Sequence, residues 1–329
     1  MMIETKRRAV HGFPIIMKDI AMVCAVLVVF ALFHHVLPRP ANALSSIVTL
    51  HTPAPEGNAP IEEAAVSTPI DEPATPVPEP TYAPGDFIAA FPTADTGVNA
   101  LHSYQSDTLR VAINMVQEND VTYYVADVWV RDISAFKTAF AKDQYGTGIH
   151  QEPVKTAVAN NAVFAITGDY YGARNKGLVI RNGDLYRDSV NSDVCVLYAD
   201  GVMETYRAAD FDMQAAAARG AWQAWGFGPQ LLDNGQGITE FDSAIKGKNP
   251  RNAIGYYEPG HYCFITVDGR QTGYSVGMTL AELSEVFANL GCKAAFNLDG
   301  GATAEMIFEG ELVNKPYKGG RQSSDIICF

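Results

Sequence analysis

Apolar and polar residues alternate along several short stretches beyond residue 100. Apolar residues occupy every second position over 109–115, and a run rich in Val, Tyr and Trp covers 121–130. A polar turn at 118–120 separates the two runs, so the pattern predicts a β-hairpin. Asn182-Gly183 and Asp200-Gly201 are further turn signals of the kind that connects neighbouring strands. Other strands are expected at 163–167, 178–181, 194–198, 263–267 and 293–298.

Two stretches have the character of helices. The alanine-rich residues 210–219 end near Gly220, and residues 279–290 carry apolar side chains on one face. Thr279 and Glu282 have the spacing of a capping box, in which each side chain accepts a hydrogen bond from the other residue's backbone. Many short strands with few helices predict an α+β fold, which is a mixed, sheet-dominated single globular domain with a few packing helices.

An apolar run near the N-terminus differs from the rest of the pattern. Residues 20–37 contain no Asp, Glu, Lys or Arg, and their length is close to the ~17-residue minimum for a membrane-spanning helix. Basic residues within 1–19 favour a cytoplasmic basic tail and a transmembrane anchor with the body outside. The small residues at 41–43 also fit a signal-peptidase site, and cleavage after Ala43 would release a secreted protein. Both interpretations export the rest of the chain.

The stretch that follows lacks the pattern of a folded domain. Residues 38–85 are rich in Pro, Ala, Glu and Thr and nearly free of aromatic side chains. Such a composition buries too little apolar surface to fold, so a Pro-rich disordered stalk is expected there. The globular domain is therefore expected at 86–329.

Charge, histidine spacing and cysteine usage narrow the function classes. The net charge of −13 and the pI of about 4.9 argue against a nucleic-acid partner, which needs a clustered basic surface. No histidine has the H-E-x-x-H spacing of a zinc site. Cys195, Cys263, Cys292 and Cys328 lack close spacing, so buried free thiols are favoured over the alternative of one disulfide.

The most informative segment lies at the end of the last predicted strand. Asn297 precedes Asp299, which is followed by Gly300, Gly301 and, two positions on, Thr303. Paired glycines let a ligand approach the backbone closely, and successive N–H groups in such a turn can bind an anion. The alternative is a plain tight turn, because Asp-Gly is a common turn pair.

A second strand ends in a similar way. Gly168 and Asp169 follow it and precede Tyr170 and Tyr171, whose rings suit packing on a sugar. Arg174 is close enough in sequence to face a phosphate. The alternative is a turn beside two core tyrosines.

Further candidates come from two other segments. Arg251 stands just before an apolar strand, and its planar guanidinium matches two phosphate oxygens, although a lone arginine is more often a solvated surface group. Asp268 and Arg270 lie at a strand-to-turn boundary that an ordinary hairpin would also explain.

These segments, in this order, resemble the phosphodiester glycosidase family over about residues 107–329. The matching motifs are NGGFF-like at 167–171, G-x-x-I-x-x-G at 177–183, G-P-x-L at 228–231, R-T-A-I-G at 251–255, V-D-G-R at 267–270, G-M-T-L-x-E-L at 277–283 and N-L-D-G-G-G-S-S at 297–304. Thr167 and Asp169 depart from the first of these motifs, and Ala302 and Ala304 depart from the last.

The resemblance implies a hydrolase that removes a sugar similar to N-acetylglucosamine from a sugar-1-phosphodiester or a glycopolymer, and the N-terminal segment makes an extracytoplasmic location the expectation. Asp299 would either attack the anomeric carbon or activate a water molecule, and Asp169 is the second candidate for this role. Arg251 would stabilise the departing phosphate. A divalent cation, Ca²⁺ or Mg²⁺, would suit the carboxylate and phosphate oxygens, and no other cofactor is expected. Substrate contacts are expected from Gly168, Tyr170, Tyr171, Arg174, Asp268, Arg270, Asn297, Gly300, Gly301 and Thr303.

Two other function classes remain open. Ala302 and Ala304 favour a non-catalytic module that binds a cell-wall or exopolysaccharide glycopolymer in the same cleft. A metal-dependent phosphodiesterase would cut the other P–O bond, but the sequence lacks a His-rich metal cluster. The expected partners are a carbohydrate phosphodiester or cell-envelope glycopolymer, and the membrane through residues 20–37.

Overall fold

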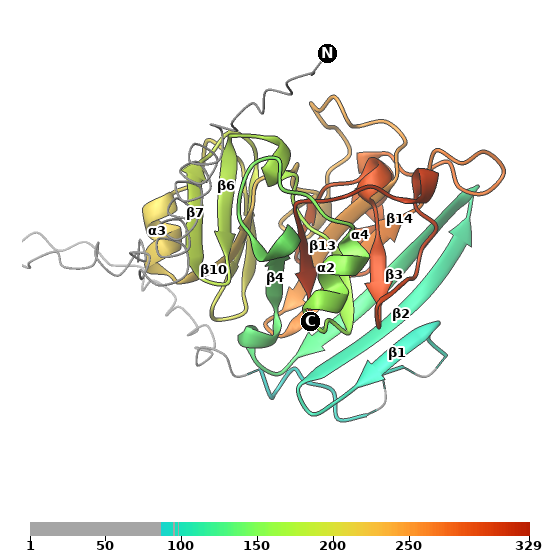
Figure 1. Cartoon of the computed structure of the whole chain (residues 1–329), viewed down its shortest axis with the longest axis horizontal. Helices are drawn as coiled ribbons and strands as arrows, with labels where there is room; N and C mark the ends of the chain where they lie inside the picture. The colour runs from blue at the N-terminus through green and yellow to red at the C-terminus, as the bar shows by residue number, and fades with distance from the viewer. Residues whose placement is uncertain (1–86, 95, 98) are drawn as a thin grey trace, which may run out of the picture. The chain divides into compact units, whose positions relative to one another are not determined.

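The predicted hairpin at 109–130 is part of the largest sheet. Strands β2 (Leu109–Glu118) and β3 (Val121–Val130) are antiparallel over their full length. The computed structural model (Figure 1) describes residues 87–94, 96–97 and 99–329, and all of them belong to one compact unit. The six-stranded sheet has the order β1-β2-β3-β14-β13-β15, with β1 (His102–Gln105), β13 (Arg251–Glu258), β14 (His261–Val267) and β15 (Ala294–Asn297).

Two five-stranded antiparallel sheets and one short strand pair complete the described fold. The first has the order β7-β6-β10-β8-β9, with β6 (Gly177–Arg181), β7 (Asp184–Ser189), β8 (Val194–Tyr198), β9 (Met203–Tyr206) and β10 (Ala221–Trp225). The second has the order β17-β16-β5-β18-β4, with β4 (Lys137–Phe140), β5 (Phe164–Thr167), β16 (Met306–Phe308), β17 (Glu311–Leu312) and β18 (Asp325–Cys328). The short pair is β11 (Leu232–Asp233) with β12 (Gln236–Gly237).

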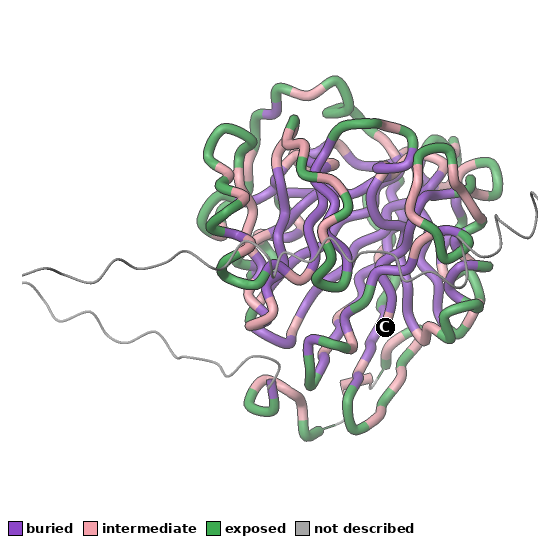
Figure 2. The backbone as a smooth tube through the Cα atoms, turned by 60° about the vertical axis from the view of Figure 1, so that its left-hand side comes forward, coloured by how far each residue is buried: buried purple, intermediate pink, exposed green. Residues whose placement is uncertain are grey.

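One central hydrophobic core lies among the three large sheets. Successive strand residues point to opposite faces, so Phe164 and Ile166 of β5 enter this core while Ala165 points outward. The other two sheets contribute in the same way, for example through Leu197 of β8 and Phe264 of β14. Figure 2 shows the result, with buried strands in the middle and exposed residues concentrated in loops.

Each large sheet has one helix packed on its outer face. Helix α4 (Leu280–Asn289) places Leu283 and Phe287 against the outer side of β3, β13 and β14. Helices α2 (Pro153–Ala159) and α3 (Met213–Ala218) do the same for the two five-stranded sheets, through small alanine side chains. The pattern of one core face and one helix face per sheet explains why β5, β6, β8, β16 and β18 are buried at every position.

The predicted capping box at α4 is confirmed. Thr279 Oγ1 accepts a hydrogen bond from the Glu282 backbone N–H at 3.1 Å, and Glu282 Oε2 accepts one from the Thr279 N–H at 2.7 Å. These two bonds satisfy N–H groups that have no partner inside the helix.

The sheet-dominated domain with few helices, expected from the sequence, is confirmed. The five further strands predicted from the pattern correspond to β5, β6, β8, β14 and β15, with ends shifted by up to two residues. The four cysteines of the domain are buried free thiols, as favoured. Strands β4, β16 and β18 and helix α2 were not predicted, because each is too short to show a period.

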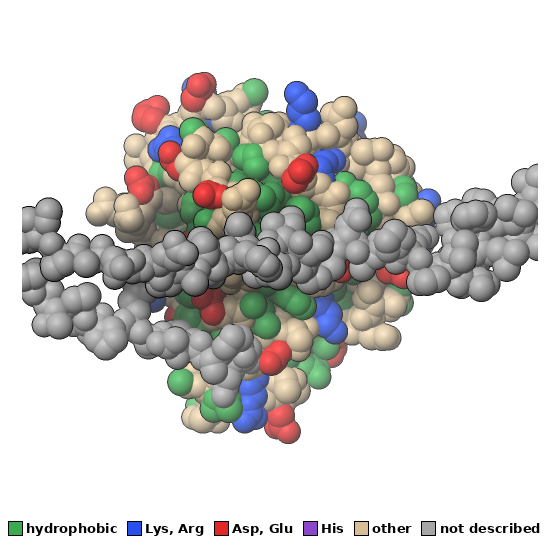
Figure 3. Space-filling model, turned by 90° about the vertical axis from the view of Figure 1, so that its left-hand side faces the viewer, with side chains coloured by type: hydrophobic (Ala, Val, Ile, Leu, Met, Phe, Trp, Pro, Cys, Tyr) green, Lys and Arg blue, Asp and Glu red, His purple; other side chains and the backbone are tan. Residues whose placement is uncertain are grey.

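The predicted tail, membrane segment and stalk at 1–19, 20–37 and 38–85 lie outside the described residues, so they stay predictions, as does the domain boundary at 86. Within the residues that the structure describes, no helix has both the length and the apolar character needed to cross a membrane. Acidic, basic and apolar side chains are interspersed on the face shown in Figure 3.

Candidate active site

Three strand ends meet at one end of the central core and bring the candidate residues together. The Asp299 backbone N–H, after β15, donates to the Gly168 carbonyl, after β5, at 3.1 Å. The Gly168 N–H in turn donates to the carbonyl of Asp325 at the start of β18, at 3.2 Å. Gly168 cannot carry a side chain, because a Cβ there would lie 2.6 Å from an Asp325 carboxylate oxygen.

Asp299 is a buried carboxylate at the edge of a pocket. The residue is 6% exposed, and its Oδ2 accepts a hydrogen bond from Thr303 Oγ1 at 2.7 Å. Arg321 Nη2 lies 3.8 Å from the same oxygen. Burial raises the pKa of Asp299 to about 6; Thr303 and Arg321 oppose this rise, and the negative charge of Asp169 adds to it. The group therefore changes charge near neutral pH, where a general base is most effective.

The glycine pair allows two chain segments to approach closely. A Cβ on Gly300 would lie 2.7 Å from the Pro250 carbonyl oxygen, and Gly301 has a φ of +67°. The Gly301 N–H donates to the same carbonyl at 2.9 Å. In this conformation that N–H is therefore engaged within the protein rather than with an anion, and the glycines serve mainly to place Asp299 beside Arg251.

Two arginines line the same pocket as Asp299. Arg251 is 3% exposed and donates to the carbonyls of Met278, Ile245 and Gly247 at 3.1, 2.6 and 2.5 Å. Burial, together with the positive charge of Arg270, lowers the pKa of Arg251 to about 10. Two positively charged guanidinium groups thus lie near each other at the pocket, and a bound anion would stabilise both charges.

Arg270 approaches the pocket from the turn after β14. A Cβ on Gly301 would lie 3.4 Å from Arg270 Nη1, and the guanidinium donates to Asn249 Oδ1 at 2.7 and 3.2 Å. Neither Arg251 nor Arg270 forms an ion pair with a carboxylate in the described part of the chain. The pocket therefore carries unneutralised positive charge beside one carboxylate.

The pocket itself is small, about 140 Å³. Asn297 contributes an unusual polar atom: its Nδ2 donates to the Gly228 carbonyl at 2.8 Å, while its buried Oδ1 has no hydrogen-bond partner among the described residues. Buried polar atoms nearly always have a partner, so this oxygen is a candidate ligand contact. The pocket is lined by Phe227, Ile245, Asn249, Pro250, Arg251, Arg270, Asn297, Leu298, Asp299, Gly300 and Gly301.

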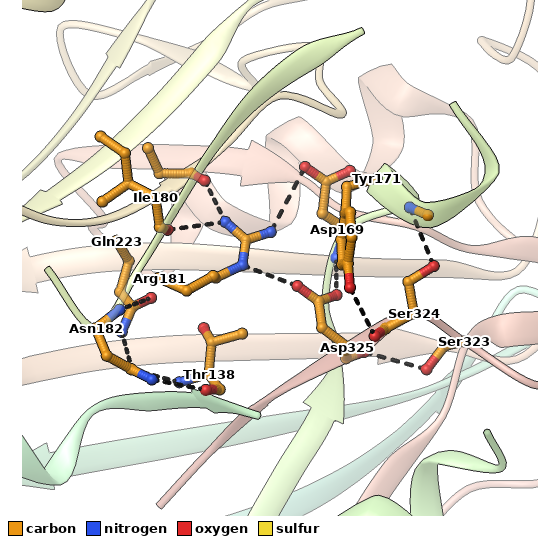
Figure 4. A network of polar contacts seen from close by, with 12 residues as sticks. Thr138, Asp169, Tyr171, Ile180, Arg181, Asn182, Gln223, Ser323, Ser324 and Asp325 are labelled. Atoms are coloured by element: carbon orange, nitrogen blue, oxygen red, sulfur yellow. Dashed lines mark hydrogen bonds and ion pairs between the residues drawn. The ribbon is translucent and has the colours of Figure 1, made fainter. Parts of the chain in front are cut away.

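Asp169 does not line this pocket but belongs to a buried ion cluster; it directly follows Gly168, whose carbonyl accepts from the Asp299 N–H. Figure 4 shows the Arg181 guanidinium facing both Asp169 and Asp325. Arg181 Nε donates to Asp325 Oδ2 at 2.9 Å, and its Nη2 lies 3.8 Å from Asp169 Oδ2. The Gly226 N–H donates to Asp169 Oδ2 at 2.9 Å, and Arg174 Nη2 lies 3.3 Å from its Oδ1. Asp169 is thus positioned to hold segments together as well as to act on Asp299 through its charge.

The two predicted tyrosines point to different places. Tyr171 is 1% exposed, stacks on Tyr145 with ring centres 5.2 Å apart, and donates to the Ser324 carbonyl at 3.4 Å. Tyr170 is half-buried, with the Arg174 and Arg321 guanidinium groups each 5.7 Å from its ring centre. Tyr170 is therefore the tyrosine available to a ligand, whereas Tyr171 fits the alternative of a core residue.

Asp268 is likewise away from the pocket. It is fully buried and accepts hydrogen bonds from Tyr274, Asn314 and the Lys315 backbone at 2.8 to 3.0 Å. These bonds tie the end of β14 to the segment after β17. The geometry supports a structural role for Asp268 more directly than a ligand contact.

Sequence reasoning missed Arg321, which lies beside Asp299, and Glu305, which accepts a hydrogen bond from Arg321. Arg321 follows Gly319-Gly320, and its backbone N–H donates to Oε1 of the buried Glu305 at 3.1 Å. Burial raises the pKa of Glu305 to about 7, an effect that the Arg321 N–H opposes. The only local signal was the glycine pair before Arg321, since nothing in the sequence places residue 321 beside residue 299.

The predicted divalent cation has no ready-made cage in the described part of the chain. No group of three or more His, Cys, Asp or Glu side chains is arranged to hold a metal there. A cation at this site would need ligands from the substrate as well as from Asp299, so the metal stays a prediction.

Comparison with known proteins relates this site to one family. One curated relative, the SPbeta prophage-derived uncharacterized protein YomE of Bacillus subtilis (strain 168), is 29% identical over 218 residues. These cover 59% of this chain and 34% of the relative, so the chain spans about a third of that protein's length.

Two solved structures share the fold. The zebrafish N-acetylglucosamine-1-phosphodiester alpha-N-acetylglucosaminidase catalytic domain, auto-inhibited by its pro-peptide, has a TM-score of 0.56 and 21% identity, over 70% of this chain and 85% of that one. A hypothetical protein from Synechocystis has a TM-score of 0.54 and 15% identity, over 70% and 64%. Identities this low show the fold alone.

The family model described as phosphodiester glycosidase matches residues 160–329, and this range holds Asp169, Arg251, Arg270 and Asp299. Since the match covers more than half of the 329 residues, the chain belongs to the phosphodiester glycosidase family.

Proposed function

We propose that this protein is an extracytoplasmic hydrolase that removes a sugar similar to N-acetylglucosamine from a sugar-1-phosphodiester or a glycopolymer. The activity for which the zebrafish structural relative is named is the model for the substrate class. Export of the domain, by an anchor at 20–37 or by cleavage after Ala43, is part of the proposal.

The observation that carries the proposal is the charge pattern of the pocket that holds Asp299. Arg251 and Arg270 lack carboxylate partners in the described chain, and Asp299 is the one acidic side chain that lines the pocket with them. Such a pocket suits a phosphate group held by the arginines and an electrophilic carbon beside the carboxylate.

The chemistry then needs little acid assistance. Water, activated by Asp299, attacks the anomeric carbon; the bond from that carbon to the phosphate oxygen breaks, and a phosphate monoester leaves with the electron pair. A phosphate monoester is a stable anion, with a second pKa of ~6, so its departure depends on charge stabilisation more than on a proton donor. Arg251 and Arg270 are placed to supply that stabilisation. Direct attack by Asp299, followed by hydrolysis of a glycosyl ester, is the other route open to the same carboxylate.

The test is to incubate the full-length protein with UDP-N-acetylglucosamine and with simple sugar-1-phosphodiesters, and to identify the products by mass. Free sugar and the intact phosphate monoester, formed in ¹⁸O-water with the label on the sugar, would support cleavage at the anomeric carbon. Label on the phosphate would instead indicate a phosphodiesterase that cuts at phosphorus. Binding without turnover would favour the non-catalytic glycopolymer-binding module that Ala302 and Ala304 suggest.

A further inference from the structure

A second and much larger cleft lies apart from the pocket that holds Asp299. Its volume is about 890 Å³, within the range of small-molecule sites. It is bordered by the edge strands of two sheets, β9 and β15, and by the turns at the ends of β8, β11 and β13. We call it the β9–β15 cleft.

One wall of the β9–β15 cleft is a fixed polar network. Arg219 Nη1 donates to Glu204 Oε1 at 2.7 Å, and its Nη2 lies 3.5 Å from Asp200 Oδ2. Tyr206 donates to the other Glu204 oxygen and shares a hydrogen bond of 2.7 Å with the hydroxyl of the buried Tyr198. Charged and hydroxyl groups are thus held in place before any ligand arrives, which lowers the entropy cost of binding.

The charges of the cleft indicate what it can accept. Arg219 is neutralised by Glu204 and Asp200, while Asp233 and Glu258 have no cationic partner within the described residues. Lys293 is the other cation that lines the cleft. The surplus of carboxylates disfavours phosphate or other anions, so this cleft differs in kind from the arginine-lined pocket.

The remaining groups suit sugar hydroxyls. The half-buried Tyr206 provides a ring with a polar end, and the exposed Asn234 provides an amide that donates and accepts, whereas Tyr256 and Gln230 are buried in the floor of the cleft. Carboxylates and amides beside aromatic rings match a neutral ligand with many hydroxyl groups and apolar ring faces.

The β9–β15 cleft and the pocket lie at opposite ends of one pair of chain segments. The Leu231 N–H donates to the Ala295 carbonyl at 2.8 Å, and the Asn297 N–H donates to the Pro229 carbonyl at 3.1 Å. Ala294 lines the cleft, and Asp299 lines the pocket. Ala294 and Asp299 are at most roughly 17 Å apart along extended chain, and the residues between them, 295–298, are buried, so the cleft and the pocket are separate openings.

We propose that the β9–β15 cleft is a carbohydrate-binding site for neutral oligosaccharide, distinct from the pocket that holds Asp299. Its place in the reaction rests on the proposed function: it would hold the sugar chain of a longer substrate while the phosphodiester lies in the pocket. Binding of neutral sugar by the cleft itself does not depend on hydrolysis.

The experiment uses the full-length protein and two neutral probes, chitotetraose and cellotetraose, with dissociation constants measured by calorimetry. Glu204→Gln removes the carboxylate charge that accepts hydrogen bonds from Tyr206 and Arg219, and Tyr206→Phe removes one hydroxyl group of the same network. Each change should weaken binding of the bound probe about tenfold or more, the loss typical of a charge-assisted hydrogen bond. Glu285→Gln, at an exposed site on α4, is the matched control and should bind as the wild type does.

A comparison of two variants separates binding in the cleft from hydrolysis in the pocket. Asp299→Asn should keep wild-type affinity for the neutral probe, and Glu204→Gln should keep wild-type turnover of a small sugar-1-phosphodiester. Failure of hydrolysis in the wild type with probe binding intact would overturn the proposed function and leave the cleft assignment standing. No saturable binding of either probe, or equal binding by folded Glu204→Gln and Tyr206→Phe variants, would overturn the cleft assignment.

Discussion

Asp299 carries two properties that act against each other. It is almost completely buried, which raises its pKa to about 6, yet it faces a pocket that holds two arginines. A raised carboxyl pKa means that the folded protein holds the proton more tightly than the unfolded chain. Ionised Asp299 therefore costs stability at neutral pH, and a functional role explains why the residue is acidic.

Replacing Asp299 by Asn should abolish turnover without unfolding the protein. The amide cannot act as base or nucleophile, so turnover should fall by ~10²–10⁴-fold. Because the buried charge disappears, the free energy of unfolding at pH 8 should stay level or rise, by on the order of 1–3 kcal/mol. Rates on one phosphodiester and melting temperatures would be measured side by side. A folded variant with near-full turnover would remove Asp299 from the mechanism.

Arg270 offers a cleaner test of phosphate binding than Arg251. Arg251 donates to three backbone carbonyls, so its removal would also disturb the fold, whereas Arg270 is exposed and bonded mainly to Asn249. Arg270→Ala should lower kcat/KM for phosphodiesters by roughly tenfold or more and leave the melting temperature nearly unchanged. The matched control is the exposed Arg131→Ala. Equal losses in the two variants would show that Arg270 acts only through general surface charge.

Local pattern predicted the candidate residues but not their arrangement. Asp299 and Arg251 each stand beside a predicted strand with a distinctive neighbour, glycine or proline, and both line the pocket. Asp169 shows the same local pattern and yet lies in the ion cluster with Arg181 and Asp325. The sequence of one turn does not show whether its carboxylate faces solvent or a buried arginine from another sheet.

At the scale of elements, the glycine turn after β15 can be tested by a pair of matched substitutions. Gly301 and Gly291 both have a positive φ, +67° and +80°, so alanine at either should cost about 1 kcal/mol of stability. Nothing lies within 4 Å of a Cβ at Gly291, whereas one at Gly301 would contact the Arg270 guanidinium. Gly301→Ala should therefore lower turnover on phosphodiesters, and Gly291→Ala should not. If both variants lose equal stability and neither loses activity, Gly301 is needed for the turn alone.

Elements with a long or marked pattern were predictable, and those fixed by distant contacts were not. The β2–β3 hairpin was predictable from the alternation of apolar and polar residues, and α4 from its capping box. Strand β18 has only four residues, all buried, and becomes a strand because β4 and β5 pair with both its edges. Helix α2 depends in the same way on the small residues of the sheet beneath it. Non-local pairing of this kind leaves no period in the sequence.

At the scale of the whole molecule, charged groups connect sheets that share no strand pairing. Arg181 comes from β6 in one five-stranded sheet, and Asp325 from β18 in the other. Asp169 adds a hydrogen bond from the Gly226 N–H after β10. This buried cluster is therefore built from both sheets, so its geometry depends on how the two sheets pack together.

Three buried carboxyl groups give the fold a pH dependence of known sign. Burial raises the pKa values of Asp299 and Asp325 to about 6, and that of Glu305 to about 7. Arg181 and the Arg321 N–H oppose the rise at Asp325 and Glu305, and Asp169 adds to it at Asp299 and Asp325. In each case the folded state binds more protons than the unfolded chain between the ordinary pKa near 4 and the raised one.

The free energy of unfolding should therefore fall as pH rises from about 5 to about 8. The rate of sugar release from a phosphodiester should rise over the same range, because the reaction needs ionised Asp299. Urea titrations at pH 5, 6.5 and 8 measure the first quantity, and initial rates the second. Glu305→Gln should flatten part of the stability slope between pH 6 and 8 without shifting the midpoint of the rate profile near pH 6, which belongs to Asp299. A stability that increases across this window would mean that the three carboxyl groups are better solvated, or better paired, than their burial implies.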